Sequence, residues 1–239
     1  MLRDSCLIKE LKSVADANQS FEWGSGKEAD SIRTLTSQEM VVAVQNILKG
    51  HNLEEGVWVF GYGSLMWNPD FKVVEKISGK ISGYHRSLCL KSIVYRGTPD
   101  YHGLVFGLDK GGSCQGMAFR IAPENLDSEL QKVWEREMFA ETYIPTWVSV
   151  KTENGGVSAI TFVINTKQND YVPDHHLDIV PATETTAAGI KGCCNDFVPN
   201  TQKFLHSLHQ RILVFVPVLT LIYYPHLSLS SNSYFERSI

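Results

Sequence analysis

The chain has 239 residues, of which 43% are hydrophobic, and this length and composition favour one compact domain with a sizeable core. The net charge is −4 at pH 7, and lysine and arginine are scattered rather than clustered, which argues against nucleic acid or an anionic membrane as a partner. The five cysteines are odd in number and include no Cys-x-x-Cys pair. They favour a reducing, cytoplasmic setting over a disulfide framework or a zinc site.

The N-terminal part of the chain divides into an arm and a helix. Residues 1–34 show little patterning, and we expect them to form a partly ordered arm. A helix is predicted to begin at Thr36, where Glu39 three residues later completes a capping box. Gly50 is expected to end this helix.

The central part of the chain reads as short strands separated by turn signals, with one helical segment at 123–139. This pattern predicts an α+β fold, a small bent β-barrel of about six or seven strands with an inserted helix and flanking helices. The candidate strands are 57–62, 77–82, 86–95, 103–108, 115–121, 147–151 and 157–164.

The first of these strands runs directly into a turn that contains two glycines. Gly61 and Gly63 free the main chain for unusual conformations and for close approach of another group. Successive bare amides at such a turn can form a nest that binds an anion. Tyr62 and Ser64 add two hydroxyl groups at the same place.

Several motifs in this region are similar to those of a known enzyme family. The segment at 60–69 reads Phe-Gly-Tyr-Gly-Ser-Leu-Met-Trp-Asn-Pro, and later matching segments lie at 95–99, 111–120, 134–138 and 143–147. Together they resemble the γ-glutamylcyclotransferases, most closely the ChaC-like branch that acts on glutathione. The resemblance spans about residues 56–208, and we expect a catalytic domain at 35–210.

This resemblance implies an internal attack, in which the α-amine of a γ-glutamyl unit closes on its own γ-carbonyl. With glutathione as the small-molecule substrate, the products are 5-oxoproline and cysteinylglycine. The reaction needs no metal, nucleotide or other cofactor. It needs a group that moves a proton between two nitrogens and fixed donors for the oxyanion.

Helical periodicity singles out one carboxylate for the proton transfer. Projected on a helix, Glu137 falls in the middle of the apolar face, whereas Glu135 points to solvent. A carboxylate on an apolar face is costly unless it is paired or functional. Glu137 also matches the catalytic glutamate of the family, and the alternative is a structural ion pair with Arg96 or Arg120.

The resemblance also implies a set of substrate-binding residues. The loop is expected to grip the γ-glutamyl group mainly through main-chain N–H groups, Arg96 to fix the loop, and Tyr143 to supply a second hydroxyl. Arg96 and Tyr143 are equally compatible with hydrogen bonding in the core. The predicted loop residues are Tyr62, Gly63, Ser64 and Leu65.

Two other features invite a chemical interpretation that we do not favour. Cys114 follows a Gly-Gly turn, but no histidine lies near it in sequence, and we interpret it as structural. His175 and His176 are adjacent and lack further ligands at a usual spacing. We interpret that segment as a solvated loop, and no metal site is expected.

The C-terminal part departs from the resemblance. A helix pair is plausible at 182–208, where Asn200, Phe204, Leu205 and Leu208 match the family. Residues 211–239 form an apolar, then serine-rich tail that does not match. Its apolar run at 212–224 is shorter than the roughly 20 residues a membrane-spanning helix needs. A packed strand-like terminus, a surface anchor and an altered end of the gene remain alternatives.

Three other functions remain open from the sequence. The same chemistry could act on other γ-glutamyl amino acids or amines. The fold could serve as a non-catalytic binding or regulatory module, although Glu137 is retained. The tail could make the chain a tail-anchored interaction protein. The sequence does not fix the oligomeric state.

Overall fold

A computed structural model describes residues 35–92, 103–138, 141–173, 188–189, 192–193, 200–201 and 203–205. Several sequence-based expectations lie outside these residues. They are the N-terminal arm at 1–34, the position of Arg96, the paired histidines at 175–176, Leu208 and the tail at 211–239.

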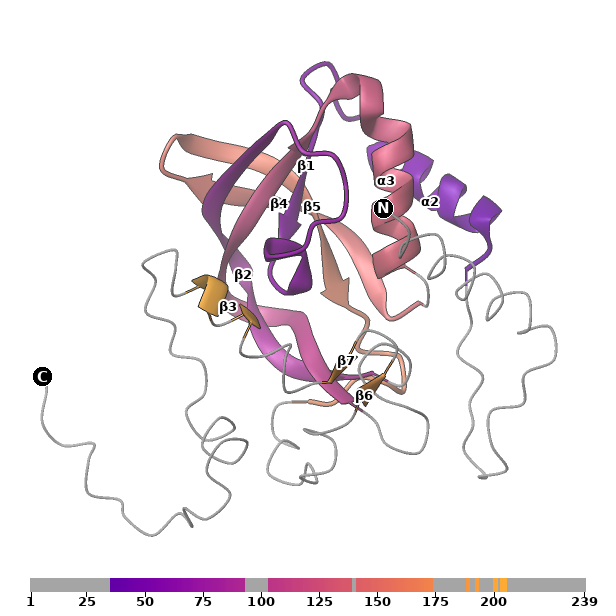
Figure 1. Ribbon diagram of the computed structural model, residues 1–239, viewed down its shortest axis with the longest axis vertical. Coiled ribbons are helices and arrows are strands. Elements are labelled where there is room, and N and C mark those ends of the chain that lie inside the picture. The colour runs from indigo at the N-terminus through magenta and orange to yellow at the C-terminus, as the bar shows by residue number, and fades with distance from the viewer. Residues whose placement is uncertain are drawn as a thin grey trace, which may run out of the picture.

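Five strands form a closed barrel in the order β1-β3-β2-β4-β5, and β5 closes it by pairing in parallel with β1. All other neighbours in the barrel are antiparallel. Together with two helices packed on one side, the barrel confirms the expected α+β class (Figure 1). The strands are β1 (Val57–Gly61), β2 (Glu75–Ser92), β3 (Gly103–Ile121), β4 (Tyr143–Thr152) and β5 (Gly155–Ile164).

The barrel has five strands rather than the six or seven expected. Two pairs of candidate strands are in fact continuous, because the pairing of β2 with β3 resumes on both sides of each interruption. Gly83 lies opposite Gly111 and Gly112 at a register shift, and all three have positive φ. These glycines therefore bend the ribbon at a bulge and do not end its strands.

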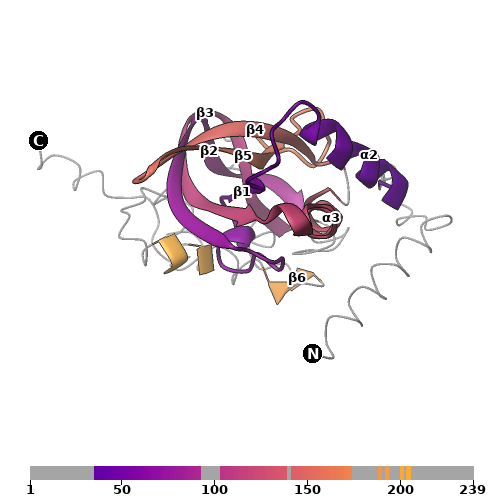
Figure 2. The same cartoon turned by 90° about the horizontal axis from the view of Figure 1, so that it is seen from above.

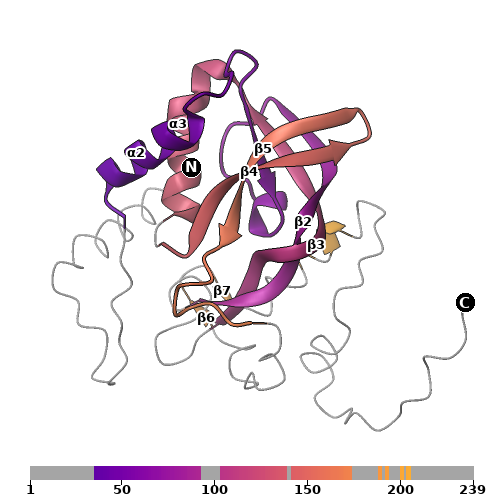
Figure 3. The ribbon, with the colours of Figure 1, turned by 180° about the vertical axis from the view of Figure 1, so that it is seen from behind.

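Two helices cover one side of the barrel and lie against each other (Figures 2 and 3). Helix α2 (Ser37–Leu48) begins with the expected Thr36–Glu39 capping box. The 3₁₀ turn η2 (Pro123–Asn125) leads into helix α3 (Leu126–Glu137). Among the described residues, no helix is long and apolar enough to cross a membrane.

Strand β1 is buried on both faces, as its continuous apolar sequence predicts. Val57 and Val59 pack with the two helices in one core cluster, while Phe60 belongs to the cluster inside the barrel. The helix-side cluster also holds Leu130 and Trp134 of α3. Packing against one rigid strand thus fixes the helix that carries Glu137 relative to the turn that follows β1.

Short elements complete the described fold. The 3₁₀ helix η1 (Ser64–Met66) follows β1 directly. The two-residue strands β6 (Ala188–Gly189) and β7 (Gly192–Cys193) pair with each other. Helical residues near 200–205 bury Leu205 against Met66, Met117 and Phe119.

Candidate active site

The substrate-loop candidate connects β1 to η1. The Met66 N–H donates to the Gly63 carbonyl at 3.0 Å and closes the turn. Within the described part of the chain, the N–H groups of Gly63, Ser64 and Leu65 donate to no main-chain acceptor. Unpaired donors at a helix start can receive an anionic group, such as a carboxylate or an oxyanion.

Close packing explains the first glycine of the loop. A Cβ at Gly61 would lie 2.8 Å from the Leu65 Cβ, which is shorter than real Cβ contacts. Neither Gly61 nor Gly63 has a positive φ. Gly63 nevertheless has φ −126° and ψ −129°, outside the regions that residues with a side chain usually occupy, as expected. For Gly61, the close approach of Leu65 is the reason.

Leu65 contributes to the loop through its main chain. Its side chain is buried in the core cluster beneath the helices. A ligand can therefore meet Leu65 through its main chain, where the N–H group is the donor.

Tyr62 is held through both its side chain and its main chain. Its hydroxyl donates to the Phe162 carbonyl of β5 at 2.8 Å, and its carbonyl accepts from Arg86 Nε at 2.6 Å. Burial, followed by the neighbouring Tyr143 and Glu137, raises the pKa of the Tyr62 phenol well above its usual value. Tyr62 therefore remains a neutral hydrogen-bonding group at physiological pH.

Glu137 and Tyr143 lie in the same neighbourhood as Tyr62. Tyr143 begins β4, and its phenol pKa is raised well above the usual value by burial first and then by the charge of Glu137. The Glu137 side chain at the end of α3 is 16% exposed. The structure thus brings the predicted acid–base residue and both predicted tyrosines together.

Of the two arginines considered from the sequence as partners of Glu137, Arg96 lies outside the described residues. Arg120 pairs instead with Glu75 at 2.9 Å and donates to the Glu55 carbonyl. Arg136 Nε lies 3.1 Å from Glu137 Oε1. Glu135 is on the exposed side of α3, where it accepts from Gln131, as periodicity predicts.

Arg136 is a site residue that the sequence analysis missed. Its Nη2 donates to the Ser64 hydroxyl at 2.7 Å, and its Nη1 donates to the Asn68 carbonyl at 2.5 Å. These contacts tie the end of α3 to the loop. The sequence signal that could have identified Arg136 is its position next to Glu137 in the motif at 134–138.

Arg86 of β2 is a second missed residue. Its Nη2 donates to the Gln115 carbonyl of β3 at 2.5 Å, so that one guanidinium connects the loop to two barrel strands. Burial lowers the pKa of Arg86, although the nearby Cys114 and Tyr62 oppose that shift. Within the described residues Arg86 forms no ion pair, and its positive charge favours an anionic group near the loop.

Cys114 fits a structural role. Its side chain is buried, and burial raises the pKa of its thiol despite the opposing effect of Arg86. A buried neutral thiol is a poor nucleophile. In the described part of the chain, no cluster of side chains could hold a metal ion.

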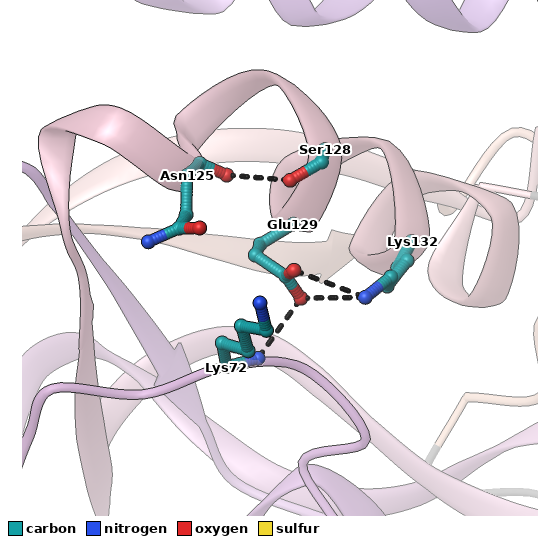
Figure 4. A network of polar contacts seen from close by, with 5 residues as sticks. All are labelled: Lys72, Asn125, Ser128, Glu129 and Lys132. Atoms are coloured by element: carbon teal, nitrogen blue, oxygen red, sulfur yellow. Dashed lines mark hydrogen bonds and ion pairs between the residues drawn. The ribbon is translucent and has the colours of Figure 1, made fainter.

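Glu129 holds α3 to the segment that follows the loop, and the sequence analysis missed it as well (Figure 4). This carboxylate is only 2% exposed, and it accepts from the Lys72 N–H at 2.9 Å and from Lys132 Nζ at 2.9 and 3.0 Å. Burial alone would raise its pKa, but these donors prevail and lower it. The spacing of Glu129 and Lys132 on one helix was a signal, but the hydrogen bond from the main-chain N–H of Lys72 had none.

The late helical segment lies against the same region. Trp67 Nε1 is 3.4 Å from the Thr201 hydroxyl, and Thr201 is fully buried. Of the late residues matched in the sequence, Leu205 is buried beside η1. The described C-terminal residues thus contact η1 and Trp67, which follow the loop.

Comparison with solved structures places this barrel in a known fold class. A crystal structure described as a γ-glutamyl cyclotransferase specific to glutathione from yeast aligns with a TM-score of 0.63. The alignment covers 70% of this chain and 94% of that chain at 17% identity. The molecule therefore has the γ-glutamylcyclotransferase fold.

Sequence comparison gives the family. The model of the ChaC-like protein family matches residues 57–213. The glutathione-specific γ-glutamylcyclotransferase of Escherichia coli is 35% identical over 67% of this chain and 67% of its own length. γ-Glutamylcyclotransferase 2-1 of Arabidopsis thaliana is 32% identical over 64% of this chain and 75% of its own length. The chain belongs to the ChaC-like protein family.

Proposed function

We propose that this protein is a glutathione-specific γ-glutamylcyclotransferase that releases 5-oxoproline and cysteinylglycine. Support for the substrate comes from the relatives named as glutathione-specific enzymes in Escherichia coli and Danio rerio. Support for the chemistry comes from the side chains around the loop at 62–65. The single observation that carries the proposal is the position of Glu137 beside Tyr62 and Arg136.

In the proposed reaction Glu137 acts as the general acid and base. Its carboxylate takes a proton from the α-ammonium of the γ-glutamyl unit, and the freed amine attacks the γ-carbonyl carbon of the same unit. The new C–N bond forms the lactam ring as the original amide C–N bond breaks. Glu137 returns the proton to the departing cysteinyl nitrogen, and the second proton that the ring nitrogen loses is passed to the same nitrogen. Cysteinylglycine therefore leaves with an ammonium group, and no water and no redox partner is consumed.

The loop is proposed to hold the γ-glutamyl group. The N–H groups of Gly63, Ser64 and Leu65 serve as donors to the substrate carboxylate or to the tetrahedral oxyanion. Tyr62 and Tyr143 present neutral phenols, because burial raises the pKa of both. We propose Arg96 as a further residue that fixes the loop.

The wider setting is also inferred. We propose that residues 35–210 form the catalytic domain and that the enzyme works in the reducing cytoplasm, where glutathione is abundant. The substrate is a small molecule, and we infer no nucleic-acid or membrane partner from the dispersed charge and net charge of −4. No metal or cofactor is required by the proposed steps.

The test is product release from a panel of substrates by the purified protein without added metal or nucleotide. Glutathione, oxidised glutathione, γ-glutamyl-alanine and γ-glutamyl-ε-lysine are compared by the 5-oxoproline formed. The proposal predicts release from glutathione above the others. If another substrate of the panel is preferred, the proposed leaving group, cysteinylglycine, is wrong. If no substrate releases 5-oxoproline, a non-catalytic module is favoured.

A further inference from the structure

Arg136 uses all three of its nitrogens in three different contacts. Nη2 donates to the Ser64 hydroxyl at 2.7 Å, Nη1 donates to the Asn68 carbonyl at 2.5 Å, and Nε lies 3.1 Å from Glu137 Oε1. The side chain is 14% exposed. A guanidinium is a rigid planar fork, so the three partners are held in a fixed arrangement.

Two of these contacts fall on one tight turn. The Asn68 N–H donates to the Ser64 carbonyl at 2.9 Å, and η1 lies between these residues. Arg136 therefore binds the two ends of the turn that presents the free N–H groups. Movement of the helix end would move this turn with it.

The contact with Ser64 also sets the direction of a proton. A serine hydroxyl has one proton and two acceptor positions. Because Arg136 can only donate, it occupies an acceptor position and the Ser64 O–H must point elsewhere. Within the described residues this hydroxyl has no acceptor, and it is therefore available as a donor to a ligand oxygen.

We propose that Arg136 is a positioning residue that sets the Glu137 carboxylate against the loop and fixes Ser64 as a side-chain donor to the γ-glutamyl group. The inference rests on the proposed function and adds a specificity-determining hydroxyl to the main-chain donors. Arg136 itself does not touch the reacting atoms.

A matched pair of variants separates this role from ordinary stabilisation. Arg136→Met is compared with Arg120→Met, because Arg120 also joins a carboxylate, Glu75, to a main-chain carbonyl, that of Glu55. Arg136→Met lowers kcat by about a hundredfold, as expected for a misplaced catalytic group. It also raises KM for glutathione, whereas Arg120→Met leaves both unchanged.

The pH profile supplies a readout that a purely structural role would not change. Loss of the neighbouring cation disfavours the Glu137 carboxylate, so the acid limb of kcat/KM moves to higher pH in Arg136→Met. Arg136→Lys keeps the charge but lacks the planar fork. Arg136→Lys is expected to keep the wild-type acid limb of kcat/KM but to have a reduced kcat. The lysine variant also replaces the methionine variant in this test if the methionine variant folds poorly.

A double-mutant cycle tests the hydroxyl. If Arg136 acts partly through Ser64, the combined Ser64→Ala and Arg136→Met variant is less impaired than the product of the single effects. Multiplicative effects would overturn the assignment of Ser64 as a donor oriented by Arg136.

An activity-free measurement keeps this inference separate from the proposed function. NMR of isotope-labelled glutamate carboxyls follows the titration of Glu137, assigned by loss of its signal in Glu137→Gln. The inference predicts a higher Glu137 pKa in Arg136→Met than in the wild type or Arg120→Met. Identical titrations would overturn it, whereas wild-type protein inactive on the whole substrate panel would overturn the proposed function.

Discussion

Arg86 Nε donates to the Tyr62 carbonyl at 2.6 Å, which ties the first residue of the loop to strand β2. The same guanidinium reaches the Gln115 carbonyl of β3. The loop therefore depends on a half-buried cation from strand β2 of the barrel wall, in addition to the helix contact made by Arg136. Both arginines meet main-chain oxygens, which explains how a glycine-containing turn keeps one conformation.

Replacement of Arg86 by methionine is expected to impair both stability and substrate binding. Two carbonyls lose their donor, and an unsatisfied buried group costs about 1–3 kcal/mol of unfolding free energy. KM for glutathione rises because the loop N–H groups are no longer held in place. Urea unfolding and steady-state kinetics measure the two effects, and Arg86→Lys restores part of each. An unchanged KM would contradict the role assigned to Arg86.

Gly61→Ala is expected to displace the loop without removing any functional group. The new Cβ would lie 2.8 Å from the Leu65 Cβ, so η1 must shift. A shift of about 1 Å at a catalytic site can cost about a hundredfold in rate. The measurement is kcat/KM for glutathione.

Gly156→Ala is the matched control for this substitution. Gly156 lies in β5 with no positive φ, and its Cβ would meet only the Val150 carbonyl at 4.0 Å. The control therefore keeps wild-type kcat/KM. Equal activity of the two alanine variants would show that the close approach at Gly61 does not matter.

The two buried phenols predict a loss of stability at alkaline pH. The pKa values of Tyr62 and Tyr143 are raised in the folded state, whereas unfolded tyrosine ionises near pH 10. The folded state then holds more protons, so their stabilising contribution is complete below about pH 10 and is lost as pH rises beyond it. The free energy of unfolding should fall less steeply above about pH 10 in the double variant Tyr62→Phe, Tyr143→Phe. Parallel slopes in variant and wild type would refute the assignment.

Glu129 predicts the opposite behaviour in acid. Its folded-state pKa is lowered, so its contribution is present above the unfolded value of about 4.3 and is lost as pH falls through the folded value. The difference in unfolding free energy between wild type and Glu129→Gln should therefore shrink below about pH 4. A difference that is constant with pH would contradict the ion-pair interpretation.

The fold and the position of Glu137 could be predicted because each follows from a local pattern. The apolar stripe of α3 predicted which carboxylate faces inward, and the capping box predicted where α2 begins. The strand count was wrong because glycine is used both to end strands and to bend them. Only the register shows that β2 and β3 continue past Gly83.

The supporting contacts could not be predicted in full, because each residue that makes them binds a main-chain atom. Arg86 meets two carbonyls, Arg136 meets another, and Glu129 meets an N–H group. A main-chain partner has no signature in the side-chain sequence. Of these three residues, Arg136 was the easiest to find from the sequence, because it is the neighbour of Glu137, which the helical periodicity identified.

The most direct test compares two isosteric substitutions on one helix. Glu137→Gln keeps the shape of the side chain but cannot carry the proton, and we expect 5-oxoproline release from glutathione to fall by about 10²- to 10⁴-fold. The fold and weak substrate binding should persist, and Glu135→Gln should retain wild-type turnover. Comparable loss in both variants, or full activity in Glu137→Gln, would contradict the assignment of Glu137 as the acid–base group.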